Sequence, residues 1–307
     1  AKTSASVSVE TKTAQLSDVM SFCRPVVGVS DMASTYDRKG GNADWWHFPA
    51  PCDGKELYEA VHLKGPGCVT RIWQTNVQAT EWLFYFDGET EPRLRFKPED
   101  LFTQDVRFIP LQGGASGGAY SYLPLPYAKS LRVVFRMPNR RPDERPYFHI
   151  NYEQYPSRTC VVSWPKRYDG MTSNVVMQCN KEWRQTRETM KQAVKSEDWN
   201  KRVLEPEQNC VFFTAEGEGT ITTLRIRLDF ERADAYIRSL ILHTLVLEAY
   251  WDGSKQASIQ VPLGDFFCNG LHPREFSSMT MAYVDGVYVC RLPMPFRKGA
   301  RLLIRND

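Results

Sequence analysis

Trp82-Leu-Phe-Tyr-Phe-Asp87-Gly88 is the stretch that decides the fold, because a related stretch returns later as Leu247-Glu-Ala-Tyr-Trp-Asp252-Gly253. Each copy is a run of residues that favour β-strands, and each ends at an Asp-Gly pair that is typical of a tight turn. Repetition of this kind is the signature of related structural units in one chain. The sequence therefore predicts two similar β-rich domains.

Three further landmarks recur in the same order, each at a similar distance from the Asp-Gly turn. They are Leu101-Phe102 and Phe266-Phe267, the segments Leu123-Pro-Leu-Pro-Tyr127-Ala-Lys129 and Leu292-Pro-Met-Pro-Phe296-Arg-Lys298, and the upstream segments that begin at Gly65 and at Glu218. Four landmarks in one order favour a duplication over chance similarity.

Short strands punctuated by Pro and Gly follow in both copies. Leu131-Arg-Val-Val-Phe135 is rich in β-formers, and Leu224-Arg-Ile-Arg-Leu-Asp-Phe230 alternates apolar and polar residues, as a sheet with one buried face requires. Frequent short strands predict an all-β fold, and the size of each copy favours a jelly-roll-type β-sandwich.

One helical segment is expected between the two copies. Asn180 is a candidate N-cap, and Trp183, Met190 and Val194 recur at helical spacing, so that these apolar residues are expected to pack on a sandwich. The predicted organisation is a flexible N-terminus over residues 1–19, a first domain over 20–165, a helical linker over 166–205 and a second domain over 206–307. The second domain is expected to be incomplete at its C-terminal end.

Composition excludes several classes of function. The 307 residues carry 39 basic and 36 acidic side chains, a net charge of +3, which is too balanced for a nucleic-acid partner. No apolar run of bilayer length occurs, so no membrane span is expected. The Ser- and Thr-rich start resembles the N-terminus of a mature exported protein, and we expect a periplasmic, cell-surface or extracellular location. The eight cysteines form no CxxC pair, and several lie in apolar strand patterns, so buried free thiols are expected. One or two disulfides are the alternative if the protein is exported.

Most motifs that suggest catalysis or metal binding have simpler explanations. Gly114-Ala-Ser116-Gly-Gly118 matches the hydrolase pattern GxSxG, but a strand rather than a helix is expected after it, so we interpret it as a flexible loop. The five histidines lack metal-ligand spacing. Glu216 and Glu218 alternate on one extended segment, which favours a solvated edge over an acid–base pair. No metal or other cofactor is expected.

The best site candidate is the segment from Tyr36 to His47. It combines a Gly-Gly turn with an arginine, an amide, carboxylates and two tryptophans, a mixture that suits sugar recognition, because aromatic rings cover the apolar sugar face and planar polar groups bond the hydroxyls. The alternative is a structured loop anchored by two core tryptophans. The candidate substrate-binding residues are Arg38, Asn42, Asp44, Trp45 and Trp46.

Taken together, the ordered motifs resemble a known family, once called domain of unknown function 2961 and now glycoside hydrolase family 172. The resemblance covers residues 34–307 and rests on GGNADWW, GPGCVTRIWQT, YFDGE, YWDG, PLGDFF and LPMPFRKGARLLI. It implies jelly-roll domains, trimers or multiples of them, and retaining hydrolysis or transfer of furanosides such as fructofuranose or arabinofuranose units.

Two departures from the family pattern qualify this expectation. The two glutamates that the family uses lie in EGDE-like and GTGTEDYF-like motifs, and neither motif occurs in these 307 residues, so no catalytic residue is assigned and the chain alone is expected to be inactive. Cys268 also stands where the family has a glycine after PLGDFF.

Two hypotheses remain open. In the first, the chain is the N-terminal portion of a furanoside-acting enzyme, and the missing part follows in a longer chain or comes from another chain. The other is a non-catalytic carbohydrate-binding or assembly protein. Either way, the expected partners are a furanoside glycan and further copies of the chain.

Overall fold

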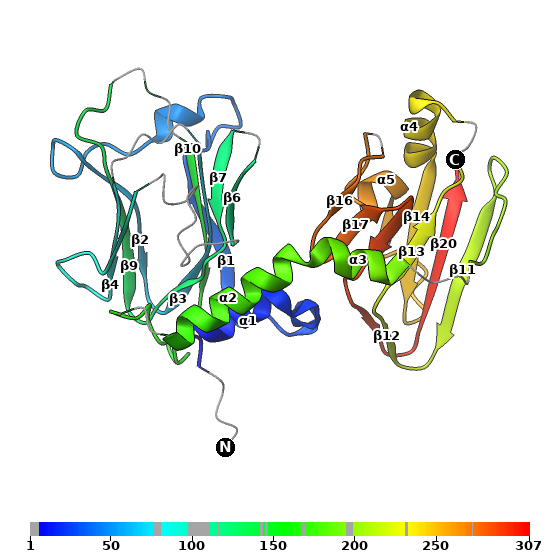
Figure 1. The fold of residues 1–307 in the computed structure, drawn as a ribbon, viewed down its shortest axis with the longest axis horizontal. Coiled ribbons are helices and arrows are strands. Elements are labelled where there is room, and N and C mark those ends of the chain that lie inside the picture. The colour runs from blue at the N-terminus through cyan, green and yellow to red at the C-terminus, as the bar shows by residue number, and fades with distance from the viewer. Residues whose placement is uncertain are drawn as a thin grey trace. The chain divides into compact units, whose positions relative to one another are not determined.

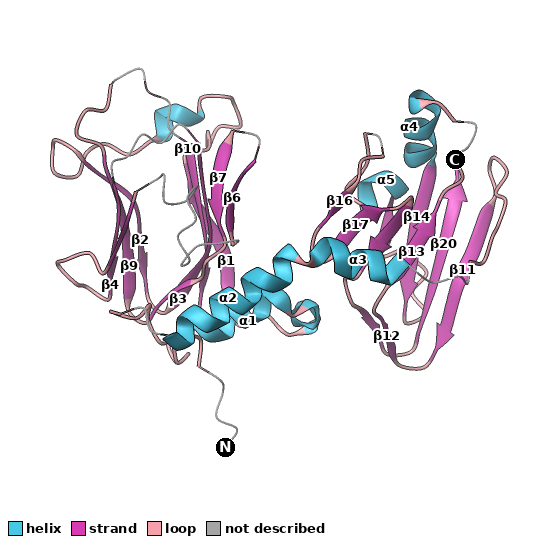
Figure 2. Ribbon diagram, viewed as in Figure 1, coloured by secondary structure: helices cyan, strands magenta, loops and turns pink. Residues whose placement is uncertain are grey.

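The structure, a computed structural model, describes residues 6–75, 81–97, 111–115, 117–141, 144, 147–167, 170–194, 199–230, 233–271 and 273–307. The chain forms two compact units, one made of Ala1–Ser17 and Pro25–Lys181 and the other of Asp18–Arg24 and Glu182–Asp307. Strands dominate both units (Figures 1 and 2). The predicted all-β class is confirmed, whereas the domain boundaries predicted above stay predictions.

The first unit is a sandwich of two antiparallel sheets. One sheet has the order β1-β10-β3-β7-β6, with β8 also paired to β3, and the other has the order β2-β9-β4-β5. The strands are β1 (Val29–Ser34), β2 (Leu57–Lys64), β3 (Gly67–Thr75), β4 (Glu81–Phe86), β5 (Leu94–Phe96), β6 (Gln112–Ala115), β7 (Gly118–Ser121), β8 (Leu125–Tyr127), β9 (Ser130–Arg136) and β10 (Tyr147–Gln154).

Aromatic residues fill the space between these two sheets. Trp82 is fully buried, and its ring lies 4.3 Å from that of Phe135 and 5.6 Å from that of Phe96, measured between centroids. Phe148 from the opposite sheet meets Phe135 at 5.2 Å. Buried aromatic rings of this size dominate the energetics of a core. The strand that contains Trp82–Phe86 therefore forms the centre of the first sandwich.

The second unit is also built mainly from antiparallel sheets. Its sheets have the orders β11-β20-β14-β15 and β13-β18-β17-β16, with a separate pair β12-β19. The strands are β11 (Asn209–Glu216), β12 (Gly219–Ile221), β13 (Leu224–Arg227), β14 (Leu245–Trp251), β15 (Ile259–Pro262), β16 (Phe276–Ser277), β17 (Met281–Val284), β18 (Val287–Cys290), β19 (Met294–Phe296) and β20 (Gly299–Asn306).

The repeated Asp-Gly turns have the same local structure in both units. Asp87 and Asp252 both take a positive φ, 55° and 57°. The Oδ1 atom of Asp87 accepts the backbone N–H groups of residues 128–130, and Oδ1 of Asp252 accepts those of residues 297–299. Each carboxylate thereby ties its turn to the segment that enters the neighbouring strand of the sheet, β9 in the first unit and β20 in the second, although that strand is distant in the chain.

Strand pairing corrects one part of the sequence alignment. Gly67 pairs with Tyr127, and Gly219 pairs with Phe296 in the same way. Gly67 therefore corresponds to Gly219. The sequence comparison above set the segment that begins at Gly65 against the one that begins at Glu218, and this places Gly67 opposite Thr220. The alignment is thus displaced by one residue. The error arose because the apolar pattern alone cannot fix register, whereas the aromatic ring that packs over each glycine does.

Helices connect and flank the sandwiches. They are α1 (Val9–Ser17), η1 (Val19–Cys23), η2 (Asp44–His47), α2 (Gly170–Arg184), α3 (Thr186–Val194), α4 (Ala235–Thr244) and α5 (Leu263–Phe266). The expected helical linker is present as α2 and α3. Asn180 does not cap it, because α2 begins at Gly170 and the Asn180 side chain accepts the N–H of Leu111. Met190 and Val194 are buried against β17 and β18, as expected.

The cysteines are less buried than expected. All eight are free thiols, but only Cys68, Cys179 and Cys290 are buried, while Cys210 is half-buried. The exposed ones are Cys23, Cys52, Cys160 and Cys268. The expectation of buried free thiols therefore holds for three of them and is wrong for the exposed ones, several of which lie in loops and not on inward-facing strand positions.

Cys268 gives a first testable prediction. This residue, where the resemblance noted above implies a glycine, has a φ of 57°, a conformation that costs a residue with a side chain about 1–2 kcal/mol. Cys268→Gly should therefore stabilise the second unit by about 1 kcal/mol, because the relief of strain exceeds the added chain entropy. Cys268→Ala, which keeps the Cβ, should give no gain. Thermal unfolding of both variants checks this, and equal melting temperatures would contradict it.

Candidate functional site

The candidate loop after β1 is organised around one carboxylate. Asp37 Oδ1 accepts the N–H of Lys39 at 2.9 Å, and its Oδ2 accepts that of Ala43 at 3.4 Å. The N–H of Asp37 in turn donates to Oδ1 of Asp44 at 2.7 Å, and His47 Nε2 lies 3.5 Å from Asp37 Oδ1. The N–H of Lys39, then that of Ala43 and the His47 ring, hold the pKa of Asp37 below its ordinary value. The loop is thus fixed by its own side chains.

The predicted binding residues lie on this loop, but their side chains differ in how firmly the loop holds them. The Arg38 guanidinium donates to the carbonyl oxygens of Tyr36 at 2.5 Å and Ser34 at 2.8 Å, and it covers the Tyr36 ring at 4.2 Å. Asn42 is exposed. Trp45 and Trp46 lie in η2, and their side chains are outside the described part of the structure. Arg38 and Asp44 therefore shape the loop, while Asn42 is open to a ligand.

The loop leaves the sheet beside a row of rings that sequence reasoning missed. Ser34 on β1 pairs with His149 on β10, His149 pairs with Trp73 on β3, and Trp73 pairs with Tyr120 on β7. Directly paired residues share one face of a sheet. The Trp73 and His149 ring centroids are 4.8 Å apart at an interplanar angle of 34°. Three rings from three strands thus lie in one row on the outer face of the six-stranded sheet.

A polar pair occupies the next row of the same face. Arg71 Nη1 donates to Asn151 Oδ1 at 3.1 Å. Partial burial, and then the charge of Arg71, lower the pKa of His149, while the charge of Asp44 acts in the opposite direction. His149 is therefore neutral at physiological pH and can both donate and accept a hydrogen bond. Asp44 is thus near enough to His149 for its charge to act on the imidazole, which makes the loop a neighbour of this row of the sheet.

These groups have the chemistry of a carbohydrate-binding surface. The rings of Trp73, His149 and Tyr120 offer apolar faces, while Asn42 and Asn151 offer amides that bond hydroxyl groups. The alternation in Gly67–Thr75 places Arg71 and Trp73 on one face, and that signal could have identified half of the surface from sequence. The contribution of His149 depends on pairing between β3 and β10, which are distant in the chain.

The other segments that suggested catalysis or metal binding in the sequence are not arranged for either. Gly114 and Gly118 belong to a hairpin in which β6 pairs with β7, so a strand follows the GxSxG pattern as expected, although the expected loop is largely strand. Ser116 itself lies outside the described residues. Glu216 and Glu218 flank Gly217 at an exposed turn. Within the described ranges, no group of three or more His, Cys, Asp and Glu residues is arranged to hold a metal ion.

Comparison with known proteins identifies the family. The family model described as GH172 first beta-sandwich domain matches residues 29–170. A second model, described as GH172 domain-like, matches residues 194–307. The chain belongs to glycoside hydrolase family 172. No curated protein matches it.

Membership in glycoside hydrolase family 172 indicates a glycoside hydrolase-like function with carbohydrate as the partner. The matched region 29–170 contains both the loop and the sheet face described above. None of the helices in the described part of the chain has the length and apolar character that a bilayer crossing requires.

Proposed function

We propose that the first unit binds furanoside residues of a glycan at the surface formed by the loop 36–47 and the outer face of β10, β3 and β7. The observation that carries this proposal is the pair of rings of Trp73 and His149, 4.8 Å apart, beside the Asn42 and Asp44 loop. Trp73 and His149 contact the apolar side of the sugar ring. Asn42 bonds the sugar hydroxyls from the loop, and Trp45 and Trp46 stay candidate stacking residues from the sequence.

Family membership supports retaining hydrolysis or transfer as the reaction that this binding serves. We assign these 307 residues the binding of the sugar and not the cleavage of the bond, because neither of the glutamate motifs expected from the resemblance occurs in them. The purified chain is therefore expected to bind fructans or arabinans and to leave aryl furanosides intact. Release of the aryl group above the buffer rate would refute this assignment.

Calorimetry on the intact chain tests the binding site. Trp73→Ala, Asn42→Ala and Trp45→Ala should each weaken glycan binding by about fivefold or more, since one stacked ring or one bonded amide contributes on the order of 1 kcal/mol or more. Tyr236→Ala is the matched control, because Tyr236 is 73% exposed on α4 of the second unit. Equal affinities in all four variants would place the site elsewhere.

The family resemblance also leads us to propose trimeric assembly and export from the cytoplasm. Sedimentation velocity should give three times the 35.4 kDa of one chain. Cell fractionation should recover the protein outside the cytoplasm. A monomer, or a purely cytoplasmic protein, would contradict the respective proposal without affecting the sugar site.

A further inference from the structure

Arg71 is a half-buried cation on the outer face of the six-stranded sheet. Its Nη1 donates to Asn151 Oδ1 at 3.1 Å, and it forms no ion pair with a carboxylate in the part of the chain that the structure describes. A guanidinium has five N–H groups and stays charged at every physiological pH. Four donors and a full positive charge are therefore left for water or for a ligand.

Three other half-buried cations of the first unit have a carboxylate partner. They are Lys12 with Glu153 at 2.8 Å, Arg93 with Glu89 at 2.7 Å, and Arg136 with Glu81 at 3.0 Å, each measured from nitrogen to oxygen. Such pairing offsets the cost of removing a charge from water. Arg71 departs from this pattern, because the group that it bonds is a neutral amide.

The carboxylates on the neighbouring strands already have other partners. β10 carries Glu153, whose two oxygens accept the Lys12 ammonium, and β1 carries Asp31, whose Oδ2 accepts the Tyr152 hydroxyl at 3.2 Å. The charge of Arg71 is therefore left for an anion that these strands do not supply.

Arg71 lies one row from the rings of the proposed sugar site. It pairs with Asn151 as Trp73 pairs with His149, and two residues along a strand span about 7 Å. Since a guanidinium can only donate, Asn151 uses its Oδ1 toward Arg71 and keeps its NH2 group as a donor. The row beside the rings thus offers donors and a positive charge, which together recognise an anionic group.

We propose that the glycan stacked on Trp73 carries a carboxylate, which Arg71 and the Asn151 amide bind in the adjacent row. This inference rests on the sugar site proposed above and narrows its ligand to acidic furanosides. A carboxylate matches the planar fork of the guanidinium and sets one charge against one. A neutral sugar would leave the charge of Arg71 without a counterpart.

Calorimetry with two matched polymers tests this proposal on the full 307-residue chain. One probe is inulin, a polymer of fructofuranose, with part of its primary hydroxyl groups oxidised to carboxylates. The other is the same oxidised polymer after its carboxylates are converted to methyl amides, so that the two differ in charge and not in backbone. The carboxylate probe should bind at least about tenfold more tightly, because a hydrogen bond to a charged group contributes more than a neutral one.

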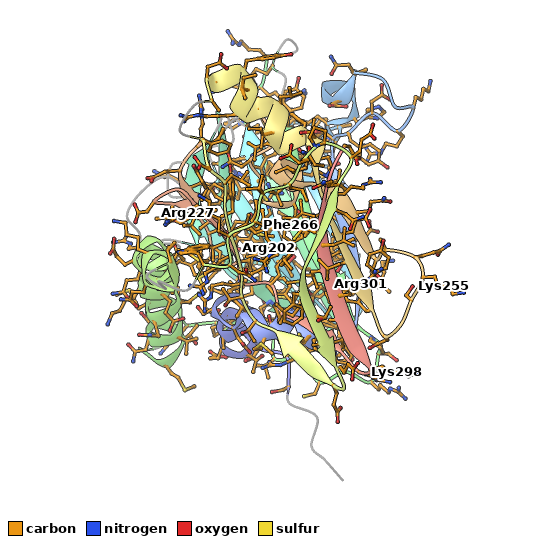
Figure 3. All side chains as sticks on the ribbon, turned by 90° about the vertical axis from the view of Figure 1, so that its right-hand side faces the viewer. Arg202, Arg227, Lys255, Phe266, Lys298 and Arg301 are labelled. Carbon is orange, nitrogen blue, oxygen red and sulfur yellow. The ribbon has the colours of Figure 1, made fainter. Side chains whose placement is uncertain are left out.

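Arg71→Gln assigns the charge effect to this side chain. Glutamine keeps a donor for Asn151, so affinity for the methyl amide probe should not change, whereas affinity for the carboxylate probe should fall to that of the methyl amide. Arg301→Gln is the matched control. Arg301 is exposed on β20 of the second unit, with its guanidinium 4.2 Å from the centroid of the Tyr250 ring (Figure 3). This variant should bind both probes as the wild type does.

The outcomes separate this inference from the sugar site on which it rests. Equal binding of the two probes by the wild type would overturn the acidic ligand and leave the sugar site standing. An equal loss in Arg71→Gln and Arg301→Gln would also overturn it, since the attraction would then be general. Loss of both probes in Arg71→Gln would give the arginine a structural role instead. Absence of binding of either probe to the wild type would overturn the acidic ligand and the sugar site together.

Discussion

Asp87→Ala is expected to lower the free energy of unfolding of the first unit by about 3 kcal/mol. The carboxylate accepts backbone N–H groups from Ala128 at 3.1 Å, Lys129 at 2.7 Å and Ser130 at 3.4 Å, and it also accepts the Ser163 hydroxyl at 2.5 Å. Alanine leaves Lys129, Ser130 and Ser163 without this acceptor, whereas the N–H of Ala128 also donates to Ser163 Oγ at 2.8 Å. Each of the three losses in a partly buried site costs on the order of 1 kcal/mol. Hydrogen exchange in β4 and β9, read against urea concentration, measures the change unit by unit.

Two matched variants test whether the lost hydrogen bonds cause the destabilisation by Asp87→Ala. Asp87→Asn keeps an acceptor oxygen and tolerates the positive φ, so it should lose less than half as much stability. Asp252→Ala removes the equivalent carboxylate of the second unit, which is exposed and accepts only backbone donors. Its effect should be smaller and confined to β14 and β20. Identical losses at both turns would mean that neither Ser163 nor burial matters at Asp87.

The stability that Asp87 supplies should also depend on pH. Partial burial opposes its ionisation, but the Ser163 hydroxyl and the N–H groups of Lys129 and Ser130 outweigh burial and lower the pKa of Asp87. A carboxyl group with a lowered pKa in the folded state stabilises it above the pKa of the unfolded state, about 3.9. The contribution is lost as the pH falls below that value. The difference between wild type and Asp87→Asn should therefore shrink between about pH 5 and the acid limit of folding.

The sequence could predict these turns because their chemistry is local. Asp followed by Gly favours a tight turn whatever surrounds it, so Asp87 and Asp252 carried the prediction of two β-domains. Asn180 shows the limit of local rules: it is a good N-cap by type, but α2 begins at Gly170 and encloses it. Its amide bonds the backbone of Leu111, a contact that no local pattern contains.

The candidate site was predictable only in part for the same reason. The loop residues Arg38, Asn42 and Asp44 lie close together in the chain, and their mixture of side chains suggested a sugar. Trp73 and His149 come together only because β3 pairs with β10, and a shift of one residue would turn either ring into the core. The register between β3 and β10 therefore decides which side chains form the site, and the sequence alone does not fix that register.

Gly67→Ala is expected to be the other severe substitution, with a loss of at least about 3 kcal/mol in the first unit. A Cβ at this position would lie 2.6 Å from the carbonyl oxygen of Glu153 and would overlap the ring of Tyr127, which is fully buried. Neither the backbone of β10 nor a buried ring can move far, so overpacking costs more here than at a yielding site. Hydrogen exchange of β3 and β10 amides should report the loss, and unchanged exchange would contradict it.

Gly219 offers the same substitution in a more tolerant setting. The three atoms nearest a Cβ there all belong to the Phe296 ring, the closest at 2.7 Å, and that ring is 8% exposed. Gly219→Ala should therefore cost about 1–2 kcal/mol, and Phe296→Leu should remove most of that cost because the clashing ring is gone. A double-mutant cycle measures this coupling, which should exceed about 1 kcal/mol. Additive effects would show that the ring over the glycine does not set the register, and the correspondence of Gly67 with Gly219 would lose its physical basis.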